Sequence, residues 1–330
     1  MATTAALPQT QTRDDAADLA RLTPGQLIWR RFRKHKMAMV GLLAWAGLLL
    51  YVTFGSWLFS RGLCAPLGKV VTGEAYANCN DTGLQLRAPS REHPFGTDLI
   101  GQDTLARTIY GGQISVTIGI LAALMEVVVG TLVGAAAAYY GGWVDSLLMR
   151  FTEAMLNIPS LFLLIVTAKF LGGRVPEVHL LGRTFSGSVI VIIIIIGLTS
   201  WMYLARIVRA NILSLKELDY ISASRALGVS DARIIFTHLL PNTIAPIIVS
   251  ATLGVANAIL SEAYVSFLGL GVQPPTASWG NMLENSYNYL ERAPWLWIFP
   301  GFFILVTVLS VNFIGDGLRD ALDPRSTRHI

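Results

Sequence analysis

The chain contains 330 residues, of which 53% are hydrophobic and only 14% are charged, and its formal net charge is +4. Globular proteins carry about 25% charged residues, so this composition indicates a membrane protein and argues against an ordinary soluble domain. The small net charge, without a long basic run interleaved with aromatic residues, also argues against nucleic-acid binding.

The N-terminal segment, residues 1–28, is polar and is predicted to be a disordered cytoplasmic segment. No apolar core lies near its start, so no cleavable signal peptide is expected. Residues 29–36, WRRFRKHK, then place five Lys and Arg residues directly before an apolar run. Such a cluster keeps the preceding segment in the cytoplasm, so residues 29–59 are interpreted as a basic anchor and a first membrane helix.

Six apolar stretches have about the 20 residues that a helix needs to cross a bilayer. They are residues 37–59, 115–139, 147–171, 189–205, 243–267 and 295–314. The third is the least uniform, since it contains Glu153, Asn157 and Pro159, and the proline is expected to kink the helix. An even number of spans places both ends of the chain on one side, and most Lys and Arg residues then fall in the cytoplasm.

The long loop after the first span, residues 60–113, is predicted to be extracytoplasmic and holds both cysteines of the chain. Cys64 and Cys79 are separated by fourteen residues. In an oxidising compartment they could form a disulfide that staples the loop, or they could stay unpaired thiols. Only His93 accompanies them in this loop and the spacing fits no zinc pattern, so no metal site is predicted.

A long polar-rich segment, residues 214–241, separates the fourth and fifth spans and is predicted to lie in the cytoplasm. Ser214 and Glu217 have the spacing of a capping box, so a helix of about 13 residues is expected to start at Ser214. Gly228 is placed to follow this helix in a left-handed conformation. Ser230 can cap a second helix, and Pro241 is expected to end it.

This segment resembles the EAA loop of the membrane subunits of bacterial ABC importers. The family pattern is Glu-Ala-Ala, three residues, Gly, nine residues, and then Ile-x-Leu-Pro. Here Ser222 stands in place of the acidic residue, and His238 in place of the isoleucine. The resemblance implies that the loop is the contact with an ATPase, and the residues assigned to this coupling are Ser222, Ala223, Ser224, Gly228, Asp231, His238 and Pro241.

Four further segments resemble the dipeptide, oligopeptide and nickel branch of these permeases in order and spacing. They are HPFGTD at 93–98 with GQD at 101–103 and Arg107, GGWVD at 141–145, SFLGLGVQPPT at 266–276 with SWG at 278–280, and GDGLRDALDPR at 315–325. The resemblance covers roughly residues 30–325. It implies an all-α membrane protein with six transmembrane helices, the type I ABC importer permease fold and a cytoplasmic EAA coupling helix.

Three polar residues inside the predicted spans are candidates for the substrate path or gate, because polar groups are costly in lipid. Glu126 lies midway along the second span, and Asn157 lies in the third. Glu126 is predicted either to line the path or contact a second permease subunit, or to pair with a polar group of a neighbouring helix. Glu262, just before the FLGLG turn, matches an acidic position of the family and is assigned to the outer gate.

Sequence motifs of ATP-binding and hydrolytic enzymes are missing. The chain has no GxxxxGK[ST], HExxH or GxSxG, so no catalytic residues are predicted. The resemblance implies that ATP and Mg are bound by two cytoplasmic ATPase subunits and that this chain binds no cofactor. It further implies a homologous second permease subunit, an extracytoplasmic substrate-binding protein, and a multi-pass location in a bacterial or archaeal cell membrane.

The predicted organisation has five parts. Residues 1–28 are the disordered N-terminus, 29–59 the anchor and first helix, 60–113 the extracytoplasmic loop, 114–320 a five-helix permease core with the coupling loop 214–241, and 321–330 a cytoplasmic tail. The predicted function is ATP-driven import of di- or oligopeptides by alternating access. Nickel chelates, glutathione or oligosaccharides are the alternative solutes. A stand-alone secondary transporter is the alternative class, although the halves show no internal repeat and no paired intramembrane acid–base set.

Overall fold

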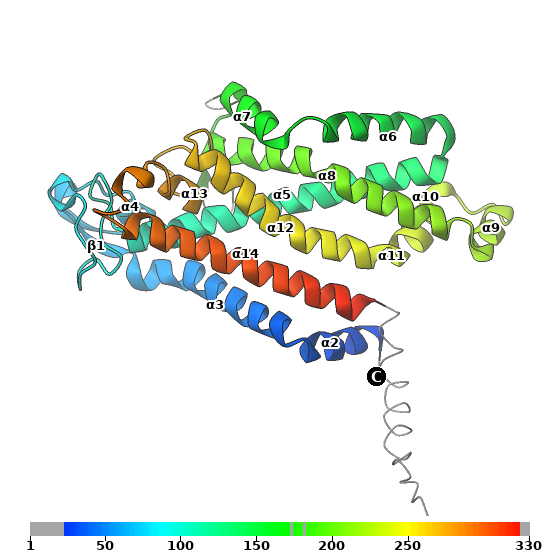
Figure 1. Ribbon diagram of the computed structural model, residues 1–330, viewed down its shortest axis with the longest axis horizontal. Helices are drawn as coiled ribbons and strands as arrows, with labels where there is room; N and C mark the ends of the chain where they lie inside the picture. The colour runs from blue at the N-terminus through cyan, green and yellow to red at the C-terminus, as the bar shows by residue number, and fades with distance from the viewer. Residues whose placement is uncertain (1–22, 172–173, 181–182, 324–330) are drawn as a thin grey trace, which may run out of the picture.

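The computed structural model describes residues 23–171, 174–180 and 183–323, which form an elongated helical bundle (Figure 1). The strands form two antiparallel hairpins, β1 with β2 and β3 with β4. The longer elements are α2 (Pro24–Lys34), α3 (Lys36–Phe59), β1 (Arg61–Cys64), β2 (Lys69–Thr72), α4 (Glu74–Ala77), α5 (Thr104–Tyr140), α6 (Gly142–Leu156), α7 (Ser160–Leu171), β3 (Val178–Leu180), β4 (Arg183–Phe185), α8 (Gly187–Leu215), α9 (Asp219–Ala226), α12 (Ile244–Phe267), α13 (Trp279–Met282) and α14 (Trp295–Leu322).

Short helical pieces complete the chain. Between α9 and α12 lie α10 (Asp231–Arg233), a π-helical segment (Ile234–Leu239) and α11 (Leu240–Asn242). Three 3₁₀ turns, Ala65–Leu67, Thr82–Leu84 and Ser286–Tyr289, lie in the loops at the opposite end of the molecule.

Among the described residues five helices are long and apolar enough to cross a membrane, namely α3, α5, α8, α12 and α14. A sixth span exists only if α6 and α7 are counted together, because they are bent by 85° at the break between them. The predicted third span, residues 147–171, is therefore divided between two helices, and the kink expected at Pro159 is a break between them. Asn157 ends α6, and Pro159, which lacks an N–H group and disfavours a helical residue before it, separates α6 from α7.

Several helices extend beyond their predicted apolar spans, because hydropathy marks only the part that suits lipid. α5 begins at Thr104 instead of 115, α8 ends at Leu215 instead of 205, and α14 ends at Leu322 instead of 314. The extension of α5 is capped by Asp103, whose Oδ1 accepts the Ala106 N–H at 2.8 Å. The last ten residues of the predicted loop 60–113 therefore belong to a helix.

The described part near the N-terminus differs from the predicted organisation. α2 begins at Pro24, so the end of the predicted disordered segment 1–28 is helical. Its helix is favoured by a capping box between Thr23 and Gln26 and by the proline in its first turn. Residues 1–22 and 324–330 lie outside the described residues, and so does most of the predicted tail 321–330.

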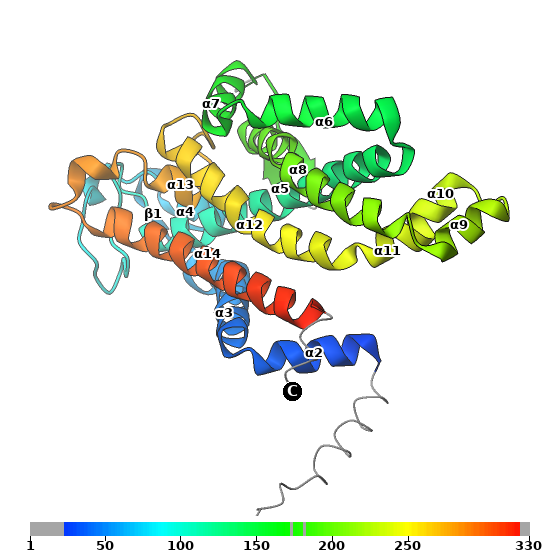
Figure 2. The ribbon, with the colours of Figure 1, turned by 45° about the vertical axis from the view of Figure 1, so that its right-hand side comes forward.

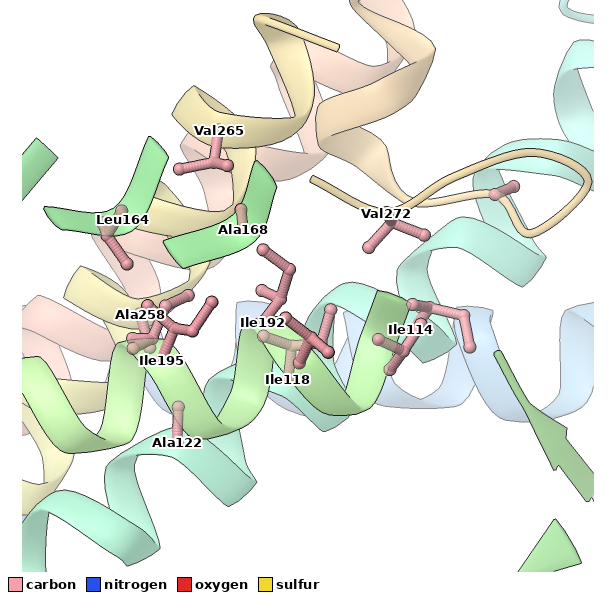
Figure 3. Close-up of a cluster of buried hydrophobic side chains, with 14 of the residues drawn as sticks. Ile114, Ile118, Ala122, Leu164, Ala168, Ile192, Ile195, Ala258, Val265 and Val272 are labelled. Atoms are coloured by element: carbon pink, nitrogen blue, oxygen red, sulfur yellow. The ribbon is translucent and has the colours of Figure 1, made fainter. Parts of the chain in front are cut away.

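The largest cluster of buried hydrophobic side chains joins α5, α7, α8 and α12 (Figure 3). Figure 3 shows side chains from these helices pointing toward one another across their interface. Despite the bend before it, α7 therefore packs into the bundle. The labelled members are Ile114, Ile118, Ala122, Leu164, Ala168, Ile192, Ile195, Ala258, Val265 and Val272.

The most extensive helix pair is α5 with α8. Gly130 and Gly134 form a GxxxG pattern on the α5 surface that faces α8. A Cβ at Gly130 would lie 2.8 Å from the Trp201 carbonyl oxygen, and one at Gly134 would meet Ala205 and Val208. Small residues of this kind let the backbones of two membrane helices approach closely, so α5 and α8 are held as one unit.

The two ends of the bundle differ in structure. β1, α4 and α13 gather at one end, called here the hairpin end, while α9 and α10 protrude at the other, called the α9 end (Figures 1 and 2). At the hairpin end a disulfide joins Cys64 to Cys79, with their Cα atoms 5.9 Å apart. The predicted extracytoplasmic loop and the predicted coupling loop thus lie at opposite ends of the helices.

Candidate functional site

The loop between α8 and α12 is a folded unit at the α9 end. Its first helix does not start at Ser214, as predicted, because α8 continues to Leu215. The Ser214 hydroxyl donates to the Ala210 carbonyl oxygen at 3.3 Å, so it bonds within α8 instead of capping the next helix. α9 begins at Asp219 and has 8 residues, fewer than predicted.

The turn after α9 has the predicted left-handed geometry. Gly228 has φ of 76° and its N–H donates to the Arg225 carbonyl oxygen at 2.9 Å. Ser230 takes the N-cap position of α10 in an extended conformation, without a side-chain capping bond. The helix does not end at Pro241, because that residue lies in the first turn of α11, where no N–H is needed. The chain from 231 to 242 therefore stays helical.

The underside of this unit is apolar and closely packed. Ile221, Ile234 and Leu239 have no exposed surface. They belong to one cluster with residues at the ends of α5 and α8, including Ala138 and Ile212. The loop is therefore a rigid extension of two membrane helices.

Polar contacts reinforce this packing at its edge. The Tyr139 hydroxyl of α5 donates to Asp231 Oδ1 at 2.6 Å. The Arg225 guanidinium lies over the Tyr139 ring, 4.9 Å from its centroid. Lys216 Nζ donates to the Ala138 carbonyl oxygen at 3.0 Å. Tyr139 thus connects α5 to both α9 and α10, a role that no sequence pattern indicated.

An ion pair, also missed in the sequence, connects α6 to α8. Arg209 Nε lies 2.5 Å from Asp145 Oδ1, and Arg209 Nη2 lies 2.6 Å from Asp145 Oδ2. A bidentate pair fixes orientation as well as distance. Asp145 lies within the GGWVD segment, so that segment holds the turn between α5 and α6 against α8.

The outer surface of the loop is uncovered. Ser222, Ala223, Gly228 and Pro241 are exposed, while Ser224 and His238 are half-buried. Ser224 Oγ donates to the Tyr220 carbonyl oxygen at 2.7 Å, and the His238 ring packs edge-on against Tyr220 with centroids 6.3 Å apart.

Large apolar side chains accompany these small residues on the loop surface. Leu227 is 84% exposed and Phe236 is 60% exposed, and Leu218 and Tyr220 are exposed as well. Apolar surface that gathers on one protruding unit indicates a protein interaction site. Asp231 is exposed as well, but its Oδ1 accepts the Tyr139 hydroxyl, so it attaches α10 to α5.

The three candidate residues of the path or gate are not brought together. Glu126 is buried in α5, facing α12 where a Cβ at Gly254 would lie 2.7 Å from its Oε2. Asn157 is exposed at the end of α6, and its Nδ2 donates to the Glu153 carbonyl oxygen at 2.7 Å. Glu262 is completely buried toward the hairpin end of α12.

Glu262 lies at the centre of a hydrogen-bond network. Ser266 Oγ and Ser278 Oγ each donate to its Oε1 at 2.6 Å, and Ser115 Oγ donates to its Oε2 at 3.2 Å. The Trp279 backbone N–H in turn donates to Ser115 Oγ at 3.1 Å. The network therefore fixes α13 and the loop after α12 to α5.

The HPFGTD and GQD segments fold back on themselves at the hairpin end. His93 Nδ1 lies 2.7 Å from Asp103 Oδ2, and Arg107 Nε lies 3.8 Å from Asp98 Oδ2. Burial raises the pKa of the Asp98 carboxyl, against the opposing effects of Arg107 and of the N–H groups of residues 100–102. These motif residues hold the loop onto the start of α5.

These features define the class of the protein: a multi-span membrane protein with a rigid, uncovered loop at one end of its helices. Residues 115–328 match the family model described as binding-protein-dependent transport system inner membrane component. Residues 23–62 match the N-terminal TM domain of oligopeptide transport permease C. The chain belongs to the family of binding-protein-dependent transport system inner membrane components, and a permease subunit of this family is a transport protein, not an enzyme.

Relatives match the chain over almost its whole length. It is 40% identical over 304 residues to the dipeptide transport system permease protein DppC of Alkalihalophilus pseudofirmus, covering 92% of this chain and 91% of the relative. It is 39% identical over 307 residues to the oligopeptide transport system permease protein OppC of Haemophilus influenzae, covering 91% and 90%. A chain of the MetNI methionine ABC transporter in inward-facing conformations is 18% identical, with a TM-score of 0.47, covering 64% and 95%.

Proposed function

We propose that this chain is a permease subunit of an ABC importer for di- or oligopeptides. The assignment of di- or oligopeptides as the solute is supported by the two relatives named as dipeptide and oligopeptide permeases. Their similarity covers about nine-tenths of each chain, so it includes the helices, the hairpin end and the α9 end.

The observation that carries the coupling role is the construction of the loop at the α9 end. Its underside is locked to α5 and α8 through Ile221 and Tyr139, while Leu227 and Phe236 face outward without a cover. A cytoplasmic ATPase that docks on this outer surface would move α5 and α8 with the loop, because the unit is packed onto both helices. ATP and Mg would be bound by two such ATPase subunits.

The orientation follows from this assignment. With α9 in the cytoplasm, both ends of the chain are cytoplasmic and the hairpin end faces outward. The basic residues of α2, at the start of the first span, support the same orientation. The hairpin end, stapled by Cys64–Cys79, is then the surface on which a substrate-binding protein releases its solute.

The transport path would form between this chain and a homologous second permease subunit, by alternating access. Glu126 supports the placement of the path beside α5 and α12, since it is a carboxyl group buried within a span and has no hydrogen bond among the described residues. At the outward side, the Glu262 network would hold the loop after α12 in one of two gate positions.

The test is co-purification in mild detergent of the tagged chain, expressed together with the genes that flank it. We expect a second permease and two ATPases to co-elute, with vanadate-sensitive ATP hydrolysis. Reconstituted vesicles should take up labelled dipeptide only when the binding protein and ATP are present. A chain that elutes alone after crosslinking would refute the importer assignment. A complete complex that takes up only another solute would refute the peptide assignment.

A further inference from the structure

The helix α2 precedes the first membrane span but is not continuous with it. Between the two helices His35 has an extended backbone, with φ of −80° and ψ of 97°. Its Nδ1 accepts the Ala38 N–H at 3.1 Å and so caps α3. Figure 2 shows α2 turned away from the axis of α3. α2 is therefore a separate helix at the end of the span.

One face of α2 is fixed against the last turns of α14. Phe32 is 4% exposed and packs with Ala38 and Ala321, and a Cβ at Gly317 would lie 3.0 Å from the Phe32 ring. Arg31 Nη1 donates to the Asp323 carbonyl oxygen at 3.2 Å. His35 Nε2 lies 3.6 Å from Asp320 Oδ2. These contacts determine which side of α2 faces outward.

The outward side is strongly basic. Arg30, Arg33, Lys34 and Lys36 are exposed, and none of them forms an ion pair with another described residue. Asp320 of α14 contacts His35, the residue between α2 and α3, and Arg31 donates to the backbone carbonyl oxygen of Asp323, the residue after α14. Trp29 lies among these cations, is 50% exposed, and stacks on Phe32 with centroids 5.8 Å apart.

The basic side lies at the level where the apolar surface of the span begins. Lys36 is the first residue of α3, and Met37, Val40 and Leu43 after it are exposed apolar residues on a membrane-spanning helix. Cations and an exposed tryptophan at such a position meet the headgroup layer of the bilayer, where the tryptophan ring is favoured and anionic lipids attract Lys and Arg.

We propose that the outward side of α2, formed by Trp29, Arg30, Arg33, Lys34 and Lys36, is a binding surface for anionic phospholipid headgroups. It holds α2 in the interface and, through Phe32, steadies the end of α14. Each Lys or Arg near an anionic membrane surface strengthens association by about fivefold, so the surface recognises charge and requires no shaped pocket.

The experiment uses the complete importer in nanodiscs and a fluorescent reporter on α2. Gly25 is exposed, lies one turn before Trp29, and a Cβ there meets nothing within 4 Å. Gly25→Cys gives this chain a single free thiol, which is labelled with bimane before assembly with the other subunits, because its two native cysteines are bonded to each other. Quenching by brominated phosphatidylglycerol is then compared with quenching by brominated phosphatidylcholine in a phosphatidylcholine bilayer.

We expect phosphatidylglycerol to quench half of the signal at a mole fraction about tenfold lower than brominated phosphatidylcholine requires, because several cations act together. This difference between the two lipids should disappear in the triple variant Arg30→Gln, Arg33→Gln and Lys34→Gln. The matched control should keep the preference for phosphatidylglycerol. It removes three exposed cations at the hairpin end, through Lys69→Gln, Arg91→Gln and Arg292→Gln.

A second variant separates charge from shape. The triple variant Arg30→Lys, Arg33→Lys and Lys34→Arg keeps all the charges. Its label should be quenched by the two lipids as in the native chain. Equal quenching by the two lipids, or an unchanged preference in the glutamine variant, would overturn the proposal. Loss of preference in the charge-conserving variant would show that side-chain shape decides binding, and would also overturn the proposal. Loss of a co-purifying ATPase from the glutamine variant, with lipid preference unchanged, would instead identify a protein contact.

Discussion

Glu262 is a carboxyl group with no exposed surface, and three serine hydroxyls donate to it. The donors come from α5, from α12 and from the residue that caps α13, so one side chain joins three segments distant in sequence. A buried polar group of this kind is expensive unless every partner is in place. Its surroundings therefore explain the acidic residue without requiring contact with a solute.

Glu262→Ala should destabilise the protein, because it leaves buried hydroxyls without their acceptor. We expect a loss of about 3 kcal/mol in the free energy of unfolding, visible as a lower thermal midpoint of the purified chain. Glu262→Gln keeps an acceptor and should lose less. The control Glu291→Ala replaces an exposed glutamate in the same half of the chain. Equal midpoints for Glu262→Ala and the control would contradict the structural role of the network.

Gly228 has a positive φ and open space around it. A Cβ at this position would meet no atom of this chain within 4 Å, so within the chain a substitution acts through backbone strain. Gly228→Val should strain the turn by about 1–2 kcal/mol and reduce peptide uptake about tenfold, whereas Gly228→Asn, which tolerates this conformation, should retain most uptake. Uptake assays with equal membrane levels of both variants check this, and normal uptake by Gly228→Val would contradict it.

At the scale of elements, the coupling role proposed for the loop at the α9 end requires a stiff attachment of the loop to α5. The attachment combines an apolar underside with the Tyr139–Asp231 hydrogen bond. Removal of the hydrogen bond should therefore loosen the coupling while the loop stays folded.

Tyr139→Phe should lower the ratio of peptide transported to ATP hydrolysed, because the hydroxyl that holds Asp231 is lost at a cost of about 1 kcal/mol. Asp231→Ala, which removes the acceptor, should have a similar effect, and the double variant should be no worse than either alone. Tyr140→Phe is the control, since Tyr140 is an exposed neighbour. If the ratio is unchanged, or if the two effects add fully, the bond does not carry coupling.

The Cys64–Cys79 disulfide closes the segment from β1 to the end of α4. A crosslink across a loop of this size stabilises by about 3 kcal/mol, so Cys64→Ser with Cys79→Ser should loosen the hairpin end without disturbing the helices. The native protein should take up alkylating reagent only after reduction, as read by intact mass. Two alkylated thiols without reductant would show that the bridge is not formed in the cell membrane.

At the scale of the whole molecule, hydropathy alone located the helices that span the membrane, because long apolar segments leave few other structures open to the chain. Hydropathy could not locate the ends of these helices, since α5, α8 and α14 continue beyond their apolar parts. It also could not reveal the 85° break between α6 and α7, because α7 is apolar enough to extend α6 as one span. The Glu262 and Tyr139 contacts join residues far apart in sequence, so only the packed helices reveal them.

The opposite placement of the two loops makes the topology testable with thiol labelling. Lys69 at the hairpin end, and Ser222 and Gly25 toward the other end, are all exposed in the described chain. Because both native cysteines are bonded together, Lys69→Cys, Ser222→Cys and Gly25→Cys each give one free thiol. In intact cells a membrane-impermeant maleimide should label Lys69→Cys alone, and all three should react after lysis. Labelling of Ser222→Cys or Gly25→Cys in intact cells would reverse the orientation, and α9 could then not meet a cytoplasmic ATPase.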